Sequence, residues 1–295
     1  MPAENTKVEG PIYDLAVVGC GPAGLSAAVN ARIRDKNLIL LGGEFCSPKL
    51  ERAPAVENYL GLPGVAGNEL RDCFLEHTGE MGINPTKARV EGIHRYNGTF
   101  QLLTRGRVYQ ARAVVLATGA APSDYLPGER EFLGRGVSHC ATCDGPLFRG
   151  KRVAVIGYTA EGEEEVRFLA GLAGKIYYLP VGYVGRGQLP PGVEVMEGKP
   201  RALTGGETLQ RLEIDGKQVE VDGVFIIRGV TPVEELVEGL ELEEGAVRVG
   251  RHMETNIPGL FAAGDCTGKP YQLAKAIGEG QVAAWSAVKY LDTLG

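Results

Sequence analysis

Residues 12–24 read Ile-Tyr-Asp-Leu-Ala-Val-Val-Gly-Cys-Gly-Pro-Ala-Gly, and this stretch decides the fold. Its apolar first half predicts a buried parallel strand. Gly19, Gly21 and Gly24 then fit the pattern G-x-G-x-x-G, and a helix is predicted directly after them over 25–34. Because the pattern stands between a strand and a helix, it favours a dinucleotide-binding turn over an ordinary glycine-rich connection.

Each glycine of this turn meets a separate physical requirement. Gly19 permits the tight turn, Gly21 lets a pyrophosphate approach the backbone, and Gly24 lets helix and strand pack closely. A bound anion then rests on the free N–H groups at the positive end of the helix. A second buried strand is predicted over 37–41. Glu44 after it is the candidate carboxylate for the ribose hydroxyls, with a solvated loop carboxylate as the alternative.

The stretch that follows is interpreted from its composition and pattern. Turn residues dominate 42–67, which predicts a loop, and a helix is predicted over 69–79. Two β-like stretches lie between residues 89 and 103. A buried strand over 112–116 ends at Ala117-Thr118-Gly119.

The same order of elements recurs in the middle of the chain. A second strand–helix–strand unit is predicted from a strand over 153–156, a turn that starts at Gly157, a helix over 163–173 and a strand over 175–179. Short alternating strands continue to about residue 227. The chain therefore carries two units of the nucleotide-binding kind.

The last part of the chain returns to the first domain. A strand over 260–263 leads into Gly264 and Asp265, and a helix is predicted over 273–291. We therefore expect an α/β fold with two Rossmann-like, three-layer nucleotide-binding domains, the second inserted into the first. The predicted domains are residues 1–122 together with 230–295, and residues 123–229.

Composition narrows the classes of function. The length of 295 residues suggests about two domains, and the formal net charge of −6 disfavours a general nucleic-acid-binding surface. The 43 glycines are about twice the usual share of ~7%. No apolar run approaches the ~18–20 residues needed to span a bilayer, and residues 1–10 do not resemble a signal peptide. We therefore expect a cytoplasmic protein with neither nucleic acid nor membrane as a partner.

Two of the six cysteines stand out. Cys140 and Cys143 form a Cys-x-x-Cys pair, whereas a zinc ribbon needs a second such pair, which the sequence lacks. Six cysteines are also few for a secreted disulfide scaffold of this length. We therefore expect a redox pair and no bound metal.

The sequence around this pair closely resembles the active site of the low-molecular-weight thioredoxin reductases. Residues 135–145 read Arg-Gly-Val-Ser-His-Cys-Ala-Thr-Cys-Asp-Gly. Four further segments match the same family: the first glycine turn, Val-Glu-Asn-Tyr over 56–59, Ala117-Thr118-Gly119 and the stretch over 255–265. The resemblance thus extends along nearly the whole chain.

The resemblance implies FAD on the first glycine turn, in the domain formed by both ends of the chain. It places Asp265 near the ribitol chain, and Asn58 with the segment starting at Gln272 near the flavin ring. The cofactor-binding residues that it implies are Gly19, Gly21, Pro22, Ala23, Gly24, Glu44, Asn58, Ala117, Thr118, Gly119, Gly264, Asp265, Gln272, Leu273 and Ala274.

In that family the second cysteine faces the flavin and the first attacks the disulfide of the partner. The resemblance therefore implies Cys143 as the flavin-interacting thiol, Cys140 as the interchange thiol and Asp144 as the acid–base group. Disulfide exchange needs a thiolate, and a neighbouring carboxylate can carry the proton. Asp144 could instead be a turn former before Gly145. We expect His139 to lie on the surface rather than to tune the thiol.

The second glycine turn departs from the family. Thr159 occupies the position where a glycine admits the pyrophosphate, and its side chain should obstruct that approach. Four glutamates in the range 161–165 crowd the start of the helix and should repel a phosphate. No basic cluster follows the strand over 175–179 to bind a 2′-phosphate. An NADPH site with unusual contacts is the alternative.

The expected electron donor is therefore a different one. The sequence is similar to a group of flavin thioredoxin reductases of anaerobic bacteria that take electrons from reduced ferredoxin. This resemblance implies a homodimer that reduces thioredoxin. Because ferredoxins are acidic, Arg186, Lys269 and Lys275 are candidate contacts for the donor. The alternative is that these three are ordinary solvated residues. Two rival hypotheses change the electron donor, which would be NADPH or NADH in one and another reduced carrier such as a deazaflavin in the other. In a third, the protein is a dithiol oxidase that passes electrons to oxygen. In a fourth, it is a flavin-bound redox sensor without turnover.

Overall fold

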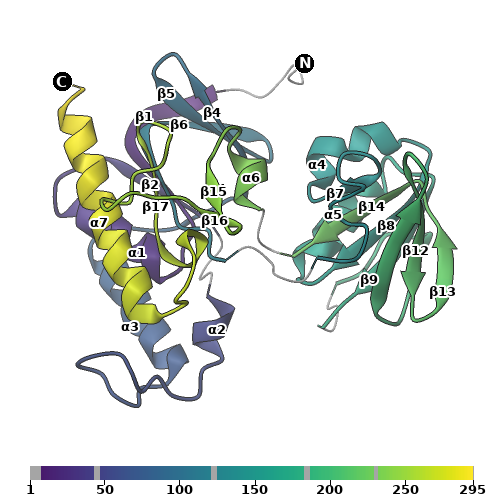
Figure 1. The fold of residues 1–295 in the computed structure, drawn as a ribbon, viewed down its shortest axis with the longest axis horizontal. Helices are drawn as coiled ribbons and strands as arrows, with labels where there is room; N and C mark the ends of the chain where they lie inside the picture. The colour runs from purple at the N-terminus through teal and green to yellow at the C-terminus, as the bar shows by residue number, and fades with distance from the viewer. Residues whose placement is uncertain (1–7, 43–46, 121–124, 183–186, 229–231, 295) are drawn as a thin grey trace. The chain divides into compact units, whose positions relative to one another are not determined.

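The computed structural model describes residues 8–42, 47–120, 125–182, 187–228 and 232–294 (Figure 1). By its contacts the chain divides into unit 1, residues 1–121 with 232–295, and unit 2, residues 122–231. Both units are strand–helix–strand folds, and the second is inserted into the sequence of the first. The predicted α/β class is therefore confirmed.

Unit 1 is built on a seven-stranded sheet of order β3-β2-β1-β6-β5-β4, with β17 also paired to β6. Its strands are β1 (Val8–Val18), β2 (Leu38–Gly42), β3 (Thr86–Lys87), β4 (Val90–Tyr96), β5 (Thr99–Thr104), β6 (Arg107–Leu116) and β17 (Leu260–Ala262). The strands β3, β2, β1, β6 and β17 run parallel, whereas β4, β5 and β6 form an antiparallel meander. The parallel strands place their carboxyl ends at one edge, where the glycine turn follows β1.

The helices of unit 1 are α1 (Pro22–Arg32), α2 (Pro48–Glu51), α3 (Gly67–Glu80), α6 (Val233–Leu236), the 3-10 turn η2 (Gly264–Thr267) and α7 (Leu273–Asp292). A small hairpin of β15 (Leu242–Glu243) and β16 (Ala246–Val247) completes the unit. One face of the sheet packs against α1 and α7, which lie side by side (Figure 1). Small residues such as Ala27 and Ala283 are fully buried between them and allow the close approach.

Unit 2 contains a parallel sheet of order β10-β9-β8-β14-β7. Its strands are β7 (Val137–Ser138), β8 (Arg152–Gly157), β9 (Lys175–Pro180), β10 (Val193–Val195) and β14 (Gly223–Ile227). An antiparallel meander of β11 (Pro200–Gly205), β12 (Leu209–Ile214) and β13 (Lys217–Glu220) packs on one face. The other face carries α4 (Ala141–Asp144), the 3-10 turn η1 (Gly145–Phe148) and α5 (Glu161–Leu169). These are three layers, as predicted.

Several elements differ from the sequence prediction, among them β6, α2 and α5. Strand β6 begins at Arg107 rather than at residue 112, because its first half pairs with β5 as a hairpin and is only half-buried. Helix α2 lies within the range 42–67 that was predicted as loop. Helix α5 ends at Leu169, four residues before the predicted end, in a segment where Gly174 packs against the backbone of Gly150.

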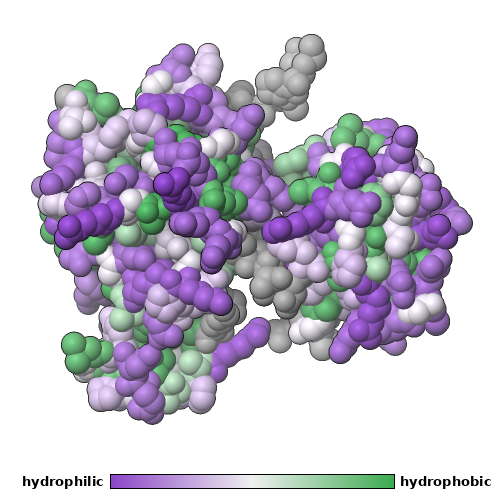
Figure 2. Space-filling model, in the orientation of Figure 1, coloured by the Kyte–Doolittle hydropathy of each residue, from purple (hydrophilic) through white to green (hydrophobic). Residues whose placement is uncertain are grey.

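The visible surface is mostly hydrophilic, with hydrophobic residues scattered singly or in small groups (Figure 2). Within the described ranges, every helix is too short or too polar to cross a bilayer.

Candidate active site

The first glycine turn is built from close backbone contacts. Gly19 has φ +115°, and a Cβ on it would overlap the carbonyl oxygen of Ala117 at the end of β6. A Cβ on Gly24 would overlap the carbonyl oxygen of Gly19. Gly21 is the N-cap of α1 and Pro22 follows it, so the first turn of α1 offers N–H groups that have no helical partner. The turn therefore has the tight backbone and the helix N-terminus that an anion site needs.

A second close approach lies next to this turn. Gly264 has φ +85°, and a Cβ on it would come within 2.7 Å of the Cβ of Ala23. The hydroxyl of Thr118 is buried at the end of β6 and finds no hydrogen-bond partner among the described residues. The space at Gly264 would be filled by any side chain, and the buried Thr118 hydroxyl needs a hydrogen-bond partner. Both features fit a bound dinucleotide at this edge of the sheet.

Two predicted flavin contacts meet although they are far apart in sequence. The Asn58 side-chain amide donates a 2.8 Å hydrogen bond to Oε1 of Gln272. Gln272 is the N-cap of α7, and Leu273 and Ala274 form its first turn. The structure therefore brings together the two segments that the sequence resemblance assigned to one ring.

The turn that carries Gly264 and Asp265 is held by a partly buried ion pair. Oε2 of Glu279 accepts hydrogen bonds from the Gly264 N–H at 2.9 Å and from the Thr267 hydroxyl at 2.8 Å. Nζ of Lys275 donates to the Gly264 carbonyl at 3.0 Å and lies 3.0 Å from Glu279. Lys275 was a candidate for docking an acidic partner, and this interpretation is wrong because its ammonium is occupied inside the turn.

The Cys-x-x-Cys pair is closed. Cys140 and Cys143 form a disulfide with an S–S distance of 2.08 Å and a Cα–Cα distance of 5.4 Å. Cys140 is the N-cap of α4, and its Sγ accepts a hydrogen bond of 3.2 Å from the Cys143 N–H. Asp144 ends the same short helix, where its N–H donates to the Cys140 carbonyl.

A third cysteine, Cys266, is buried beside Asp265 but has a different chemistry. Its thiol donates to the Ala263 carbonyl at 3.2 Å. Burial raises the pKa of this thiol to about 11, so it stays protonated at neutral pH and is a poor nucleophile. Cys266 is therefore not a candidate for the thiol exchange that the Cys140–Cys143 pair can perform.

His139 does not lie on the surface, so this expectation from the sequence is wrong. Its residue exposure is only 6%, and Nε2 lies 2.8 Å from Oε1 of Glu129, which is fully buried. Arg228 binds the same carboxylate, with Nη2 donating to Oε2 at 2.7 Å. Burial by itself raises the pKa of Glu129, but the hydrogen bonds from His139 and Arg228 outweigh it and lower the pKa to about 2. The carboxylate is therefore ionised at any physiological pH.

Glu129 and Arg228 are site residues that the sequence analysis missed. One signal was present: Arg228 follows the wholly apolar strand β14, where a charge is unexpected unless it is paired. The Arg228 guanidinium also lies over two aromatic rings, 5.0 Å from the centroid of Tyr158 and 5.7 Å from that of Tyr125. Tyr158 belongs to the second glycine turn, so the cluster reaches that turn.

The second glycine turn is filled by side chains. The hydroxyl of Tyr178 lies 3.0 Å from where a Cβ of Gly157 would stand, and Tyr178 is 1% exposed. The Thr159 hydroxyl is buried and has no hydrogen-bond partner among the described residues. Glu163 is buried and pairs with Arg167 at 3.2 Å. The glutamates of this helix are therefore partly internal, rather than all crowded at an open helix end as predicted.

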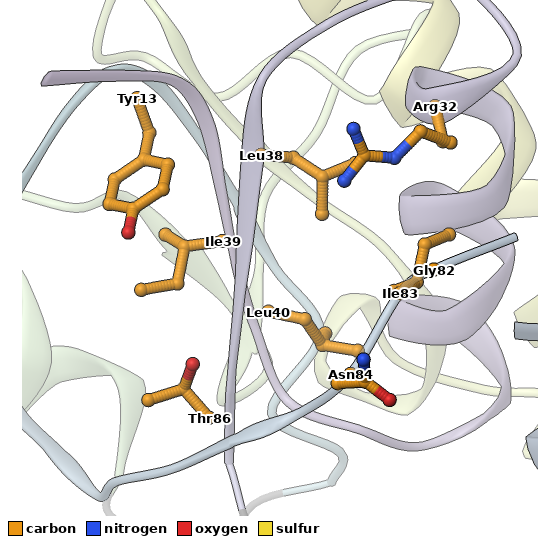
Figure 3. A pocket seen from close by; sticks show the side chains of 9 residues that line it. All are labelled: Tyr13, Arg32, Leu38, Ile39, Leu40, Gly82, Ile83, Asn84 and Thr86. Carbon is orange, nitrogen blue, oxygen red and sulfur yellow. The ribbon is translucent and has the colours of Figure 1, made fainter. Parts of the chain in front are cut away.

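Unit 1 also contains a small pocket on the outer edge of β2 (Figure 3). Its volume is about 160 Å³, and its lining includes Arg32 and Asn84 with the first residues of β2. Those β2 residues pair with β1 before the glycine turn begins. The pocket therefore lies toward the amino ends of the strands, and we do not include it in the candidate cofactor site.

Two predicted residues lie outside the described ranges. Glu44, the candidate for the ribose hydroxyls, falls in 43–46, and Arg186, a candidate docking residue, falls in 183–186. Lys269 is described and is exposed.

Comparison with known proteins gives one consistent family. Residues 13–180 and 189–280 match the family model described as pyridine nucleotide-disulphide oxidoreductase. The chain is 30% identical to the thioredoxin reductase of Bacillus subtilis, over 97% of each chain. It is also 32% identical to the NADH dehydrogenase of the same organism, of whose length it spans 58%.

A solved structure extends this comparison. A ferredoxin-flavin thioredoxin reductase from Clostridium acetobutylicum is 46% identical, with a TM-score of 0.91 over 95% of this chain and 98% of that one. The predicted resemblance to this group is therefore confirmed.

Proposed function

Because the chain belongs to the pyridine nucleotide-disulphide oxidoreductase family, we propose that it passes electrons from reduced ferredoxin through its flavin to thioredoxin. The enzyme is a thioredoxin reductase, and its cofactor is FAD. The proposal includes the donor, the residue roles, a homodimeric state and a cytoplasmic location.

In this proposal the first glycine turn holds the cofactor. The N–H groups at the start of α1 bind the pyrophosphate, and Gly19 and Gly24 keep the turn tight enough to present them. The turn fixed by Lys275 and Glu279 holds Asp265 for the ribitol chain. A flavin bound there would supply a carrier that can accept electrons singly and give them up as a pair.

The Cys140–Cys143 disulfide takes up two electrons and two protons and opens to two thiols. The Cys140 thiolate then attacks the disulfide of thioredoxin, which forms a mixed disulfide and releases one thioredoxin thiolate. The Cys143 thiolate attacks the Cys140 sulfur, so the second thioredoxin thiolate leaves and the protein disulfide closes again. Asp144, at the end of the same helix, supplies and accepts the proton at these sulfurs.

The observation that carries the choice of donor is the second glycine turn. Thr159 stands at the position where a pyrophosphate would need bare backbone, and Tyr178 and Arg228 fill the surroundings of the turn. Ferredoxin needs no such pocket, since an electron carrier docks on a surface. The likeness to the clostridial ferredoxin-flavin enzyme supports the same choice.

The test is an anaerobic reduction of the flavin by one donor at a time. Reduced ferredoxin should bleach the flavin absorbance and then reduce thioredoxin, whereas stoichiometric NADPH or NADH should leave the flavin oxidised over the same time. Fast bleaching by either nucleotide would overturn the donor assignment while leaving the disulfide chemistry intact.

A variant tests the residue roles separately. Cys140→Ser should lower thioredoxin turnover by more than about a thousandfold and should retain FAD, because the cysteine pair lies in unit 2 and the cofactor turn in unit 1. Turnover near the wild-type rate in this variant would refute the assignment of Cys140.

A further inference from the structure

We propose that Glu129, His139 and Arg228 form a positioning cluster that holds Cys140 close to Cys143 when the pair is reduced, and so favours closure of the disulfide. This inference rests on the proposed role of the pair as the redox disulfide. All three residues belong to unit 2, as do the two cysteines.

The cluster is a set of charge-assisted contacts on one buried carboxylate. Oε1 of Glu129 accepts from His139 Nε2 at 2.8 Å and from Arg228 Nη1, and Oε2 accepts from Arg228 Nη2 at 2.7 Å and from the Leu126 N–H at 2.8 Å. An ionised carboxylate only accepts hydrogen bonds, so Nε2 of His139 carries the proton. Because Glu129 is fully buried and the Arg228 side chain is 10% exposed, water cannot readily replace either partner.

The cluster is attached directly to the interchange cysteine. His139 precedes Cys140, and on its other side Ser138 Oγ accepts from the Cys140 N–H at 3.0 Å and donates to the Cys140 carbonyl at 3.1 Å. Strand β7, which ends at Ser138, pairs with β14, and Arg228 follows β14 directly. The backbone before Cys140 is therefore fixed by the sheet and the His139 side chain, and Cys140 itself by the Ser138 hydroxyl.

This restraint has a thermodynamic consequence for the redox pair. Closing the ring brings together two sulfurs, and the entropy lost in doing so falls when one of the two backbones is already held in place. With oxidised dithiothreitol as the oxidant, closure transfers two electrons and two protons from the two thiols to dithiothreitol. An anchored His139 should therefore raise the equilibrium constant of this exchange, whereas a merely space-filling residue would not.

The measurement is the equilibrium of the FAD-loaded protein with mixtures of reduced and oxidised dithiothreitol under anaerobic conditions. Free thiols are alkylated, and the peptide carrying Cys140 and Cys143 is quantified by mass spectrometry. His139→Asn is too short to reach Glu129 and should lower the closure constant about fivefold to tenfold. His139→Gln can still donate to Glu129 and should stay within about twofold of wild type.

Matched variants separate positioning from general destabilisation. Arg228→Met removes a buried partner of Glu129 and should lower the closure constant as His139→Asn does. Arg201→Met removes an exposed ion pair with Asp215 in the same unit and should leave the constant unchanged. Equal closure constants for His139→Asn and His139→Gln would overturn the proposal, as would a wild-type constant for Arg228→Met.

The assay needs neither ferredoxin nor thioredoxin. Failure of the donor assignment would therefore appear only in the bleaching experiment, and failure of the positioning cluster only in the closure constant. If Arg228→Met does not fold, the two His139 variants still decide the question, because both are polar and differ chiefly in reach.

Discussion

The two glycine turns of this protein share one glycine spacing and differ at its middle glycine. Gly19, Gly21 and Gly24 in unit 1 correspond by spacing to Gly157, Thr159 and Gly162 in unit 2. The first and last glycines of both turns approach each other closely: a Cβ on Gly162 would lie 2.8 Å from the Gly157 Cα, and one on Gly24 would overlap Gly19. Only the middle glycine, whose role is to admit a ligand, is lost.

The difference separates two roles of glycine in the motif. The outer glycines serve helix–strand packing, which both units need in order to fold. The middle one serves a pyrophosphate, and unit 2 has replaced it and filled the neighbouring space with side chains such as Tyr178. A unit can thus keep the fold of a nucleotide-binding domain without keeping its site.

The largest expected effect comes from copying the second turn into the first. Gly21 has φ −80° and ψ −178°, which a threonine tolerates, so Gly21→Thr introduces no backbone strain. Its side chain should obstruct the pyrophosphate and weaken FAD binding by about a hundredfold or more. The measurement is the FAD content of the purified protein and the affinity of the stripped protein for FAD.

Gly79→Ala is the matched control for that variant. Gly79 lies in α3 of the same unit, and a Cβ there would meet nothing within 4 Å. It should retain FAD fully. Wild-type FAD affinity in Gly21→Thr would mean that the two turns do not differ in the way proposed.

A smaller effect is expected from the positioning cluster of Glu129, His139 and Arg228. Glu129→Ala removes the carboxylate partner of the mostly buried Arg228 charge, which should cost about 3–5 kcal/mol of unfolding free energy. Arg201→Met, which removes an exposed pair, should cost less than about 1 kcal/mol. Urea unfolding followed by circular dichroism measures both, and equal costs would show that the buried cluster does not stabilise unit 2.

The same cluster predicts a pH dependence. The folded pKa of Glu129 is lowered to about 2 from an ordinary value of 4.5, so its stabilising contribution is complete above the unfolded pKa. That contribution should be lost as the pH falls from 4.5 toward 2. Across this pH window, the free energy of unfolding of wild type should therefore fall toward that of Glu129→Gln. Urea unfolding midpoints of both proteins at successive pH values measure this difference. An advantage that persists unchanged to the lower end of the window would contradict the pairing.

The smallest effect is expected from the reverse exchange in the second turn. Thr159→Gly restores the middle glycine but leaves the Tyr158–Arg228 contact and the buried Glu163 in place. Flavin reduction by NADPH or NADH should therefore stay at the wild-type level in an anaerobic stopped-flow assay. A gain of more than about tenfold would show that Thr159 alone had closed a functional nucleotide site.

The local pattern of the sequence was enough for the main outline of this protein. Three features depend only on residues that are close in sequence: both strand–glycine–helix units, the Cys140–Cys143 pair and the loss of the middle glycine at Thr159. The spacing of such residues directly restricts the backbone conformation. The boundaries of β6 and α5 were less accurate, because pairing with β5 and packing of Gly174 involve distant segments.

Tertiary structure alone decided how single polar residues are used. Lys275 was a candidate docking residue and His139 was expected on the surface, yet Lys275 is held within the Gly264 turn and His139 is buried against Glu129. Glu129 and Arg228 lie 99 positions apart, and no local periodicity links them. A buried charge is stable only beside a partner, and the fold decides which residue that partner is. The sequence by itself therefore determined the two turns, whereas the tertiary structure determined which charged residues are buried and paired.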